Sequence, residues 1–323
     1  MPPVGFLQSK RRRRNREILF EDTALRRKTA LEQGNPLRGF LYELEYNSCT
    51  RKGAFMISDY HVHTLFSTDS EALPEEHITK AIALGMKEIC FTDHIDYDYP
   101  PQNGSQPFTF EPDEYFARLS ALRDKYASLI KIKIGVELGL NPQCDIPNRQ
   151  LVNGYPFDFV IGSSHLVDGG DPYYAEFWQD KSISECITAY YEAVLRNVTL
   201  FNDYDVYGHL DYIRRYVPDK SFVYVDADYR DILDMILKNI VSKGHGIELN
   251  TRELSNGLTH FIPTIALLKR YRELGGEIVT VGSDAHITKN IGYAFATARD
   301  ILLNSGFKYV TTFEKRMPTY MPL

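Results

Sequence analysis

The sequence predicts an α/β fold built on a parallel sheet. From residue 56 onward, short runs rich in β-formers alternate with longer segments that have helical spacing. Most of the short runs end in a histidine or an acidic residue, although the chain as a whole is 43% hydrophobic. Strands that alternate with helices form parallel sheets, because each helix returns the chain to the same end of the sheet. A closed or distorted barrel and an open doubly wound sheet both satisfy this pattern.

The expected elements follow one another without long gaps. The strands are expected at residues 56–63, 87–94, 132–140, 157–165, 205–211, 246–251 and 277–286. The helices are expected at residues 74–85, 112–129, 183–199, 226–243, 260–274 and 290–304. Pro74 and Pro112 suit first helical turns, and Gly85, Gly244 and Gly275 mark helix ends. No GxGxxG follows the first strand, so a dinucleotide-binding fold lacks its signature.

Residues 1–55 differ from the rest of the chain in charge. They carry 12 Lys and Arg against 6 Asp and Glu, whereas the remainder carries 25 against 37. The basic run from Lys10 to Arg14 leaves three interpretations open: a disordered tail, a nucleic-acid-binding arm, or a start assigned upstream of Met56. We favour the tail or the misassigned start, because basic runs are usually solvated. Residues 56–323 then form the domain in which strands and helices alternate.

The composition of this domain favours a small substrate. An acidic surface repels nucleic acid and suits a protein that collects metal cations. No run of eighteen apolar residues indicates a membrane span, and no apolar segment follows the basic start, so we expect a cytoplasmic protein without a membrane partner. The four cysteines form no CxxC pair, so we expect reduced thiols.

Residues that can bind metal gather at the ends of the expected strands, where six of the nine histidines stand. Carboxyl ends of parallel strands meet on one face, so residues far apart in the sequence converge there. On a strand, residues i and i+2 share a face, so His61 and His63 can bind one ion. The candidate ligands are His61, His63, Asp69, His94, Glu137, His165, His209, Asp284 and His286. Imidazole with carboxylate suits zinc, iron or manganese.

At these residues the sequence resembles the polymerase and histidinol phosphatase (PHP) superfamily. The matching segments are His61-Val-His63, Thr92-Asp93-His94, Ser164-His165, Gly208-His209 and Ser283-Asp-Ala-His286, together with Asp69 and Glu137. The resemblance implies a distorted (β/α)7 barrel with three metal ions at the strand ends. It assigns one ion to His61, His63, Glu137 and Asp284, a second to Glu137, His165 and His209, and a third to Asp69, His94 and His286. Family members often have histidine where this chain has Asp69.

Within the superfamily, YGHLDYIRR (207–215) and IELNTRE (247–253) resemble the monofunctional histidinol-phosphatases. This branch implies hydrolysis of L-histidinol phosphate to L-histidinol and phosphate in histidine biosynthesis. Asp284 or His286 is the expected catalytic proton shuttle to the leaving alkoxide. Arg215 and Arg252 follow the fifth and sixth strands, where a guanidinium can bind phosphate, and Asn250 is expected to orient a ligand or the substrate.

Three other functions stay open. A PHP phosphoesterase can act on nucleotides, nucleic acid or phosphotyrosine, and a PHP domain can be a non-catalytic scaffold. The complete ligand set disfavours the scaffold. Amidohydrolases also begin with HxH on a barrel, but Glu137 and His165 stand where their carboxylated lysine is expected.

Overall fold

The computed structural model describes residues 58–100, 107–258 and 260–323. The interpretations of residues 1–55 concern a segment outside this part of the chain. The residues of the sheet all lie inside the described part, so the structure can distinguish a barrel from an open doubly wound sheet.

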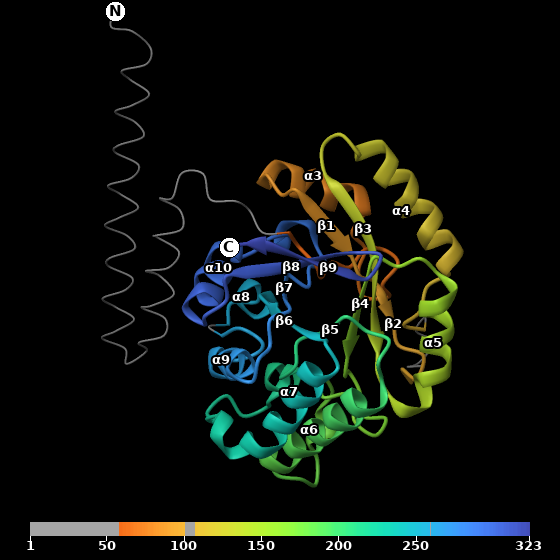
Figure 1. Cartoon of the computed structure of the whole chain (residues 1–323). Coiled ribbons are helices and arrows are strands. Elements are labelled where there is room, and N and C mark those ends of the chain that lie inside the picture. Colours follow the sequence, from red (N-terminus) through yellow and green to blue (C-terminus); the bar gives the residue numbers. More distant parts are fainter. Residues whose placement is uncertain (1–57, 101–106, 259) are drawn as a thin grey trace, which may run out of the picture. The chain divides into compact units, whose positions relative to one another are not determined.

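A curled parallel sheet occupies the middle of the described chain (Figure 1). Its hydrogen-bonded order is β1-β3-β4-β5-β6-β7, and β2 pairs with the far part of β3. The strands are β1 (Glu88–Phe91), β2 (His94–Ile95), β3 (Lys131–Gly139), β4 (Phe159–Ser163), β5 (Val206–Tyr207), β6 (Gly246–Asn250) and β7 (Val279–Gly282). Every pairing is parallel. The strand expected at 87–94 is therefore divided into β1 and β2, which pair with successive parts of β3.

Residues 58–63 close the sheet into a ring. Asp59 forms a parallel bridge with Ile89 in β1, and Val62 forms a parallel bridge with Ala285, just after β7. The segment thus lies between the first and last strands and joins them. The open doubly wound alternative is wrong, and the distorted barrel is confirmed.

Helices surround the sheet (Figure 1), as expected for strands joined by crossovers. They are α3 (Pro74–Leu84), α4 (Pro112–Tyr126), α5 (Asp145–Gly154), α6 (Ile183–Leu200), α7 (Arg230–Ser242), α8 (Arg252–Ser255), α9 (Ile265–Glu273) and α10 (Phe295–Asn304). Short 3₁₀ segments are η1 (Pro142–Cys144), η2 (Ala175–Trp178), η3 (Tyr212–Tyr216), η4 (Asp226–Tyr229) and η5 (Thr288–Asn290). All six expected helices are present, with shifted ends.

Two helices begin later than expected, because local residues set where each helix can start. The helix expected from residue 260 begins at Ile265, because Pro263 cannot continue a helix and the Thr264 hydroxyl caps the first turn by accepting from Leu267 N. The helix expected from residue 290 begins at Phe295, since Ala294 has a φ of 58°. Helices α5 and α8 had not been expected.

An antiparallel hairpin of β8 (Tyr309–Glu314) and β9 (Met317–Pro322) follows the last helix and was also missed by the sequence reading. Phe313 in β8 is buried, with its ring centroid 4.9 Å from that of Phe159 in β4. Arg316, in the hairpin turn, donates its backbone N–H to the carbonyl of Asp158, directly before β4. The hairpin therefore covers the amino ends of the strands, which leaves the carboxyl ends for the functional site.

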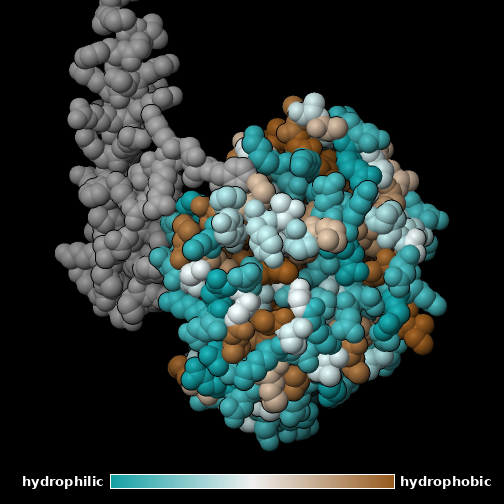
Figure 2. Space-filling model, viewed as in Figure 1, coloured by the Kyte–Doolittle hydropathy of each residue, from teal (hydrophilic) through white to brown (hydrophobic). Residues whose placement is uncertain are grey.

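The face of the described chain seen in Figure 2 is mostly hydrophilic, with apolar side chains scattered in small areas. Among the described residues, no helix is both long and apolar enough to span a lipid bilayer.

Candidate metal centre

The carboxyl ends of the strands bring the nine expected ligands together. Eight of them form four overlapping groups in which the potential ligand atoms lie within 4.8 Å of one another. The groups are His63, His94 and His286; His61, His209 and Asp284; His61, His63 and Glu137; and His94, Glu137 and His165. The ninth, Asp69, accepts a hydrogen bond from His286, with its Oδ2 2.9 Å from Nε2. Tertiary structure thus joins residues separated by more than two hundred positions.

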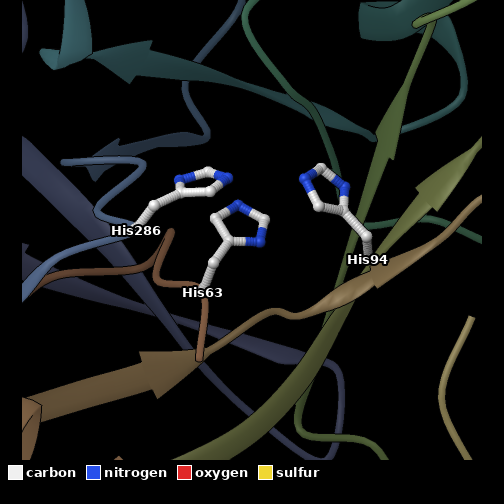
Figure 3. Close-up of side chains that lie close together, drawn as sticks. All are labelled: His63, His94 and His286. Carbon is white, nitrogen blue, oxygen red and sulfur yellow. The ribbon is translucent and has the colours of Figure 1, made fainter. Parts of the chain in front are cut away.

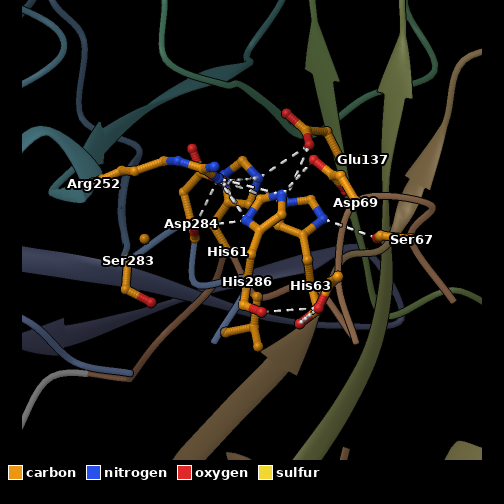
Figure 4. Close-up of polar contacts among 12 residues, drawn as sticks. His61, His63, Ser67, Asp69, Glu137, Arg252, Ser283, Asp284 and His286 are labelled. Atoms are coloured by element: carbon orange, nitrogen blue, oxygen red, sulfur yellow. Dashed lines mark hydrogen bonds and ion pairs between the residues drawn. The ribbon is translucent and has the colours of Figure 1, made fainter. Parts of the chain in front are cut away.

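Glu137, near the end of β3, lies at the centre of the cluster and is fully buried. Its Oε2 atom faces three histidines. The distances are 3.1 Å to His61 Nε2, 3.5 Å to His63 Nε2 and 3.0 Å to His94 Nδ1. One carboxylate oxygen of Glu137 therefore points toward the histidines of residues 58–63 and of β2 (Figure 4).

The other oxygen of Glu137 faces the later strands. Oε1 lies 2.7 Å from His209 Nε2 and 3.3 Å from His165 Nε2, and it also accepts a hydrogen bond from Ser163 Oγ at 2.7 Å. A carboxylate with imidazoles at each oxygen has the arrangement that a ligand shared by two metal ions requires.

Unpaired polar atoms indicate that the cluster fits cations. Within the described part of the chain, His61 Nε2, His63 Nε2, His94 Nδ1 and Glu137 Oε2 are buried and make no well-aligned hydrogen bond. Such atoms are costly in a protein interior unless a ligand satisfies them. Nitrogen and oxygen donors that converge at 3.0 to 3.5 Å can be satisfied together by a divalent ion.

A second part of the cluster lies towards the rim. The ring of His63 stands between those of His94 and His286, with both centroid distances at 4.2 Å (Figure 3). Asp284 Oδ1 lies 3.5 Å from His63 Nε2. Asp284 also has a φ of 50°, a left-handed conformation that costs a non-glycine residue free energy and is found most often at functional sites.

The electrostatics favour ionised carboxylates. Burial opposes charge on Glu137, yet His61, His94 and His165 hold its pKa well below the usual range. Burial likewise opposes charge on Asp284, and the positive charge of Arg252 contributes most to lowering its pKa. A buried site that keeps its carboxylates charged attracts cations.

Glu248 contacts the side of His61 that faces away from Glu137, and the sequence analysis did not predict this role. It lies in β6, and its Oε1 is 2.6 Å from His61 Nδ1, while Oε2 accepts the backbone N–H of His209 at 2.9 Å. A Cβ at Gly282 would lie 2.1 Å from Glu248 Oε1 and 2.3 Å from His61 Cβ, so glycine is required there. A carboxylate behind a histidine fixes its ring orientation and tautomer.

Asp96 has the same role on the other side and was also missed. Its Oδ1 lies 2.7 Å from His165 Nδ1, and its Oδ2 lies 3.5 Å from His94 Nδ1. Both missed carboxylates left a signal in the sequence. Asp96 stands two positions after His94, and Glu248 stands two positions before Asn250. Each acidic residue therefore shares a face of an extended run with another polar residue.

A cavity of about 330 Å³ opens beside the cluster. Asp69, His94, His165, His209, Asp284 and His286 form its polar floor, and Arg215 and Arg252 stand at one side. Its size falls in the range of small-molecule sites, so the metal-binding groups face a space that can admit a substrate.

Comparison with known proteins identifies the family. A model of the PHP domain matches residues 59–252. The chain belongs to the PHP family. The histidinol-phosphatase of Lactococcus lactis subsp. lactis is 38% identical over 258 residues, which cover 79% of this chain and 93% of the relative. A probable histidinol-phosphatase of Clostridium acetobutylicum is 35% identical over 270 residues, 82% of this chain and 100% of the relative.

A solved structure extends the likeness to three dimensions. The crystal structure of the Lactococcus lactis histidinol phosphate phosphatase, complexed with zinc, L-histidinol and phosphate, superposes with a TM-score of 0.76 at 36% identity. The match covers 82% of this chain and 100% of that structure. Within the PHP family, the chain belongs to the histidinol-phosphatase branch, as its sequence motifs predicted, and the cluster is a divalent-metal centre.

In this PHP chain the two arginines expected near the substrate both reach the centre. Arg252 Nη1 donates to Asp284 Oδ1 at 2.6 Å and also contacts His286, and Arg215 pairs with Glu253 and lies 3.2 Å from Asp284 Oδ2. Both line the cavity. Arg252 is the more accessible of the two, with 26% of its side chain exposed against 8% for Arg215.

Asn250 is fully buried. Its Nδ2 donates to Glu248 Oε2 at 3.1 Å and to Asp284 Oδ2 at 3.3 Å, and its Oδ1 accepts from Arg252 N at 2.9 Å. These contacts favour the ligand-orienting alternative for Asn250 over direct contact with a substrate.

Other polar residues of the first strand region are structural. Asp59 turns away from the metal centre, where its carboxylate accepts hydrogen bonds from Ser283 N and Oγ and from Gly292 N. His77 is buried, with its Nε2 2.9 Å from the carbonyl of His63. His77 is thus a buried structural residue of α3.

Proposed function

We propose that this chain hydrolyses L-histidinol phosphate to L-histidinol and phosphate, as a step of histidine biosynthesis. The observation that carries the proposal is a cavity in which a cluster of histidines and carboxylates lies directly beside Arg252. Its relative from Lactococcus lactis, with bound zinc, L-histidinol and phosphate, supports the choice of substrate among phosphate esters.

Three divalent ions, of zinc, manganese or iron, fit the donor set. His61, His63, Glu137 and Asp284 would hold one ion, and Glu137 would share a second with His165 and His209. Asp69, His94 and His286 would hold the third. Zinc, manganese and iron accept mixed nitrogen and oxygen ligands, and the carboxylate at Asp69 suits the harder ions among them.

The chain's own groups bind and orient the substrate around this centre. Bound divalent ions would supply Lewis-acid polarisation of the phosphoryl oxygens and would lower the pKa of a water, so that it can lose a proton and attack phosphorus. Arg252 is placed to hold a phosphoryl oxygen, because among the described residues only Nη1 of its guanidinium makes hydrogen bonds. Asp284 or His286 would take up the proton that the attacking water releases and pass it to the departing alkoxide.

Phosphate release by the purified, metal-loaded protein tests the proposal. L-Histidinol phosphate is compared with nucleotides, a phosphotyrosine peptide and short RNA. We expect a strong preference for L-histidinol phosphate, and the same preference after deletion of residues 1–55, since the catalytic domain is assigned to 56–323. Preference for another ester would replace the substrate, and absence of hydrolysis with all of them would favour the scaffold.

A further inference from the structure

We propose that Asp171 binds the ammonium group of the substrate and makes the cavity selective for phosphate esters that carry a cation. The inference rests on the proposed function and adds to it the residue that recognises the part of the substrate away from the phosphate. Asp171 lies in the segment between β4 and η2 and lines the cavity.

Asp171 is held in a fixed orientation. Its Oδ2 accepts a hydrogen bond from Tyr99 Oη at 2.6 Å, and its Oδ1 accepts from the backbone N–H of Tyr173 at 2.8 Å. Its residue surface is only 9% exposed. A carboxylate can accept about four hydrogen bonds, so each oxygen keeps capacity for a ligand.

Asp171 forms no ion pair within the described part of the chain. In residues 58–100, 107–258 and 260–323, no Lys, Arg or His nitrogen lies within 4.0 Å of its carboxylate, and the charge of His165 acts on it only from a longer distance. Burial raises its pKa, and a bound ammonium group would oppose that effect. A buried, oriented and unpaired carboxylate on a cavity wall is the complement of a cationic ligand.

Aromatic rings form the wall around Asp171. Tyr99 and Phe108 lie with ring centroids 4.2 Å apart, and Tyr173 and Tyr216 with centroids 5.5 Å apart. All four rings line the cavity. Aromatic faces attract cations and stack on planar groups, so this wall suits an ammonium or an imidazole ring.

The aromatic wall also separates Asp171 from the arginines. Tyr173 contacts Tyr216, Tyr216 contacts Tyr212 at 5.0 Å between centroids, and the Arg215 guanidinium lies 5.1 Å from the Tyr212 ring. The cavity therefore has its two arginines, Arg215 and Arg252, on one side and Asp171 on another, with the metal centre as its floor. A molecule with phosphate at one end and a cation at the other matches this distribution of charge.

The test compares Asp171→Asn with the wild-type protein on two substrates. One is L-histidinol phosphate, and the other is 3-(imidazol-4-yl)propyl phosphate, which has the same ring and phosphate but no amine. We expect Asp171→Asn to lower kcat/KM for L-histidinol phosphate roughly 10- to 100-fold, mainly through KM, because a charge-assisted hydrogen bond is lost. Turnover of the amine-free ester should change by less than about threefold.

Asp168→Asn is the matched control. Asp168 lies in the same segment, but it is exposed and pairs with Arg196 at the surface, so both substrates should be used as by the wild type. An equal loss of kcat/KM on both esters in Asp171→Asn, or no loss on either, would overturn the assignment of Asp171 while leaving the proposed function standing. Failure of the wild-type protein to hydrolyse either imidazole ester overturns the proposed function, and the assignment of Asp171 with it.

Discussion

The two ends of the barrel both bury carboxylates, but they satisfy them differently. At the amino ends, Asp158 accepts the backbone N–H groups of Ile134 and Lys315, and Asp205 accepts from Val160 N and from Arg316 Nε at 3.1 Å. At the carboxyl ends, Glu137 faces histidines whose nitrogens are themselves buried without a well-aligned hydrogen bond.

The difference distinguishes carboxylates that stabilise the fold from carboxylates that are available to a ligand. A buried carboxylate that is saturated by N–H groups and a guanidinium fixes the backbone around it, as Asp205 fixes the hairpin turn to the start of β5. A buried carboxylate surrounded by other unpaired donors has been left for a ligand. Substitutions at the two ends should therefore alter different measured quantities.

The largest effect is expected for His61→Ala at the carboxyl ends. It should remove bound metal and lower kcat about 1000-fold or more, because a metal ion contributes several kcal/mol to the transition state. Metal content by elemental analysis, kcat and far-UV circular dichroism are measured together. His245→Asn is the control, since His245 precedes β6 at the opposite end and its ring packs against that of Tyr204. Full activity of a His61→Ala protein would contradict the ligand assignment.

Arg252→Ala should have the next largest effect. We expect kcat/KM for the phosphate ester to fall roughly 100-fold with metal content retained, because a charge-assisted contact to phosphate is lost. Steady-state kinetics measure the change, and Arg272→Ala, on the outer face beside Glu277, serves as the control. Unchanged kinetics would remove Arg252 from the site.

Glu248→Gln should weaken metal binding while leaving the volume of the side chain almost unchanged. The substitution removes the charge behind His61, and we expect metal affinity to fall about 10- to 100-fold, as for other residues that orient a metal-bound histidine. Competition with a chelator measures the affinity. Glu185→Gln, at the exposed start of α6, should leave it unchanged. Equal affinities in the two variants would count against a positioning role.

The smallest effect is expected at the amino ends, and it concerns stability. Burial raises the pKa of Asp205 to about 6, so Asp205 itself favours folding below its unfolded pKa and loses that contribution as pH rises through about 6. Arg316 offsets the loss only while Asp205 is ionised. Arg316→Ala should therefore lower the free energy of unfolding by about 1–2 kcal/mol near neutral pH, and by less near pH 5.

Urea unfolding of the wild type and of Arg316→Ala at the two pH values measures this difference, and Asp205→Asn should abolish its dependence on pH. Metal content should stay the same in both variants. A loss of bound metal in Arg316→Ala would contradict the view that the amino ends affect stability alone.

Much of the fold could be predicted because the signals are local. Short runs of β-formers, helix-terminal glycines and Pro74 at a helix start depend on neighbouring residues only. The hairpin β8–β9 was missed because its residues bury few side chains, and Phe313 acquires its burial from Phe159, far away in the sequence. Helix α5 begins directly after the 3₁₀ turn at Pro142–Cys144, so its start lacks a separate signal.

The sequence by itself determined which residues could bind metal and that they stand at strand ends, because side-chain chemistry and strand periodicity are properties of short segments. Only the tertiary structure decided which oxygen of Glu137 faces which histidine, that Glu248 and Asp96 support the rings, and that Asp171 stands across the cavity from the arginines. The physical reason is that closure of the barrel through residues 58–63 sets these distances, and that closure depends on hydrogen bonds between segments at opposite ends of the described chain.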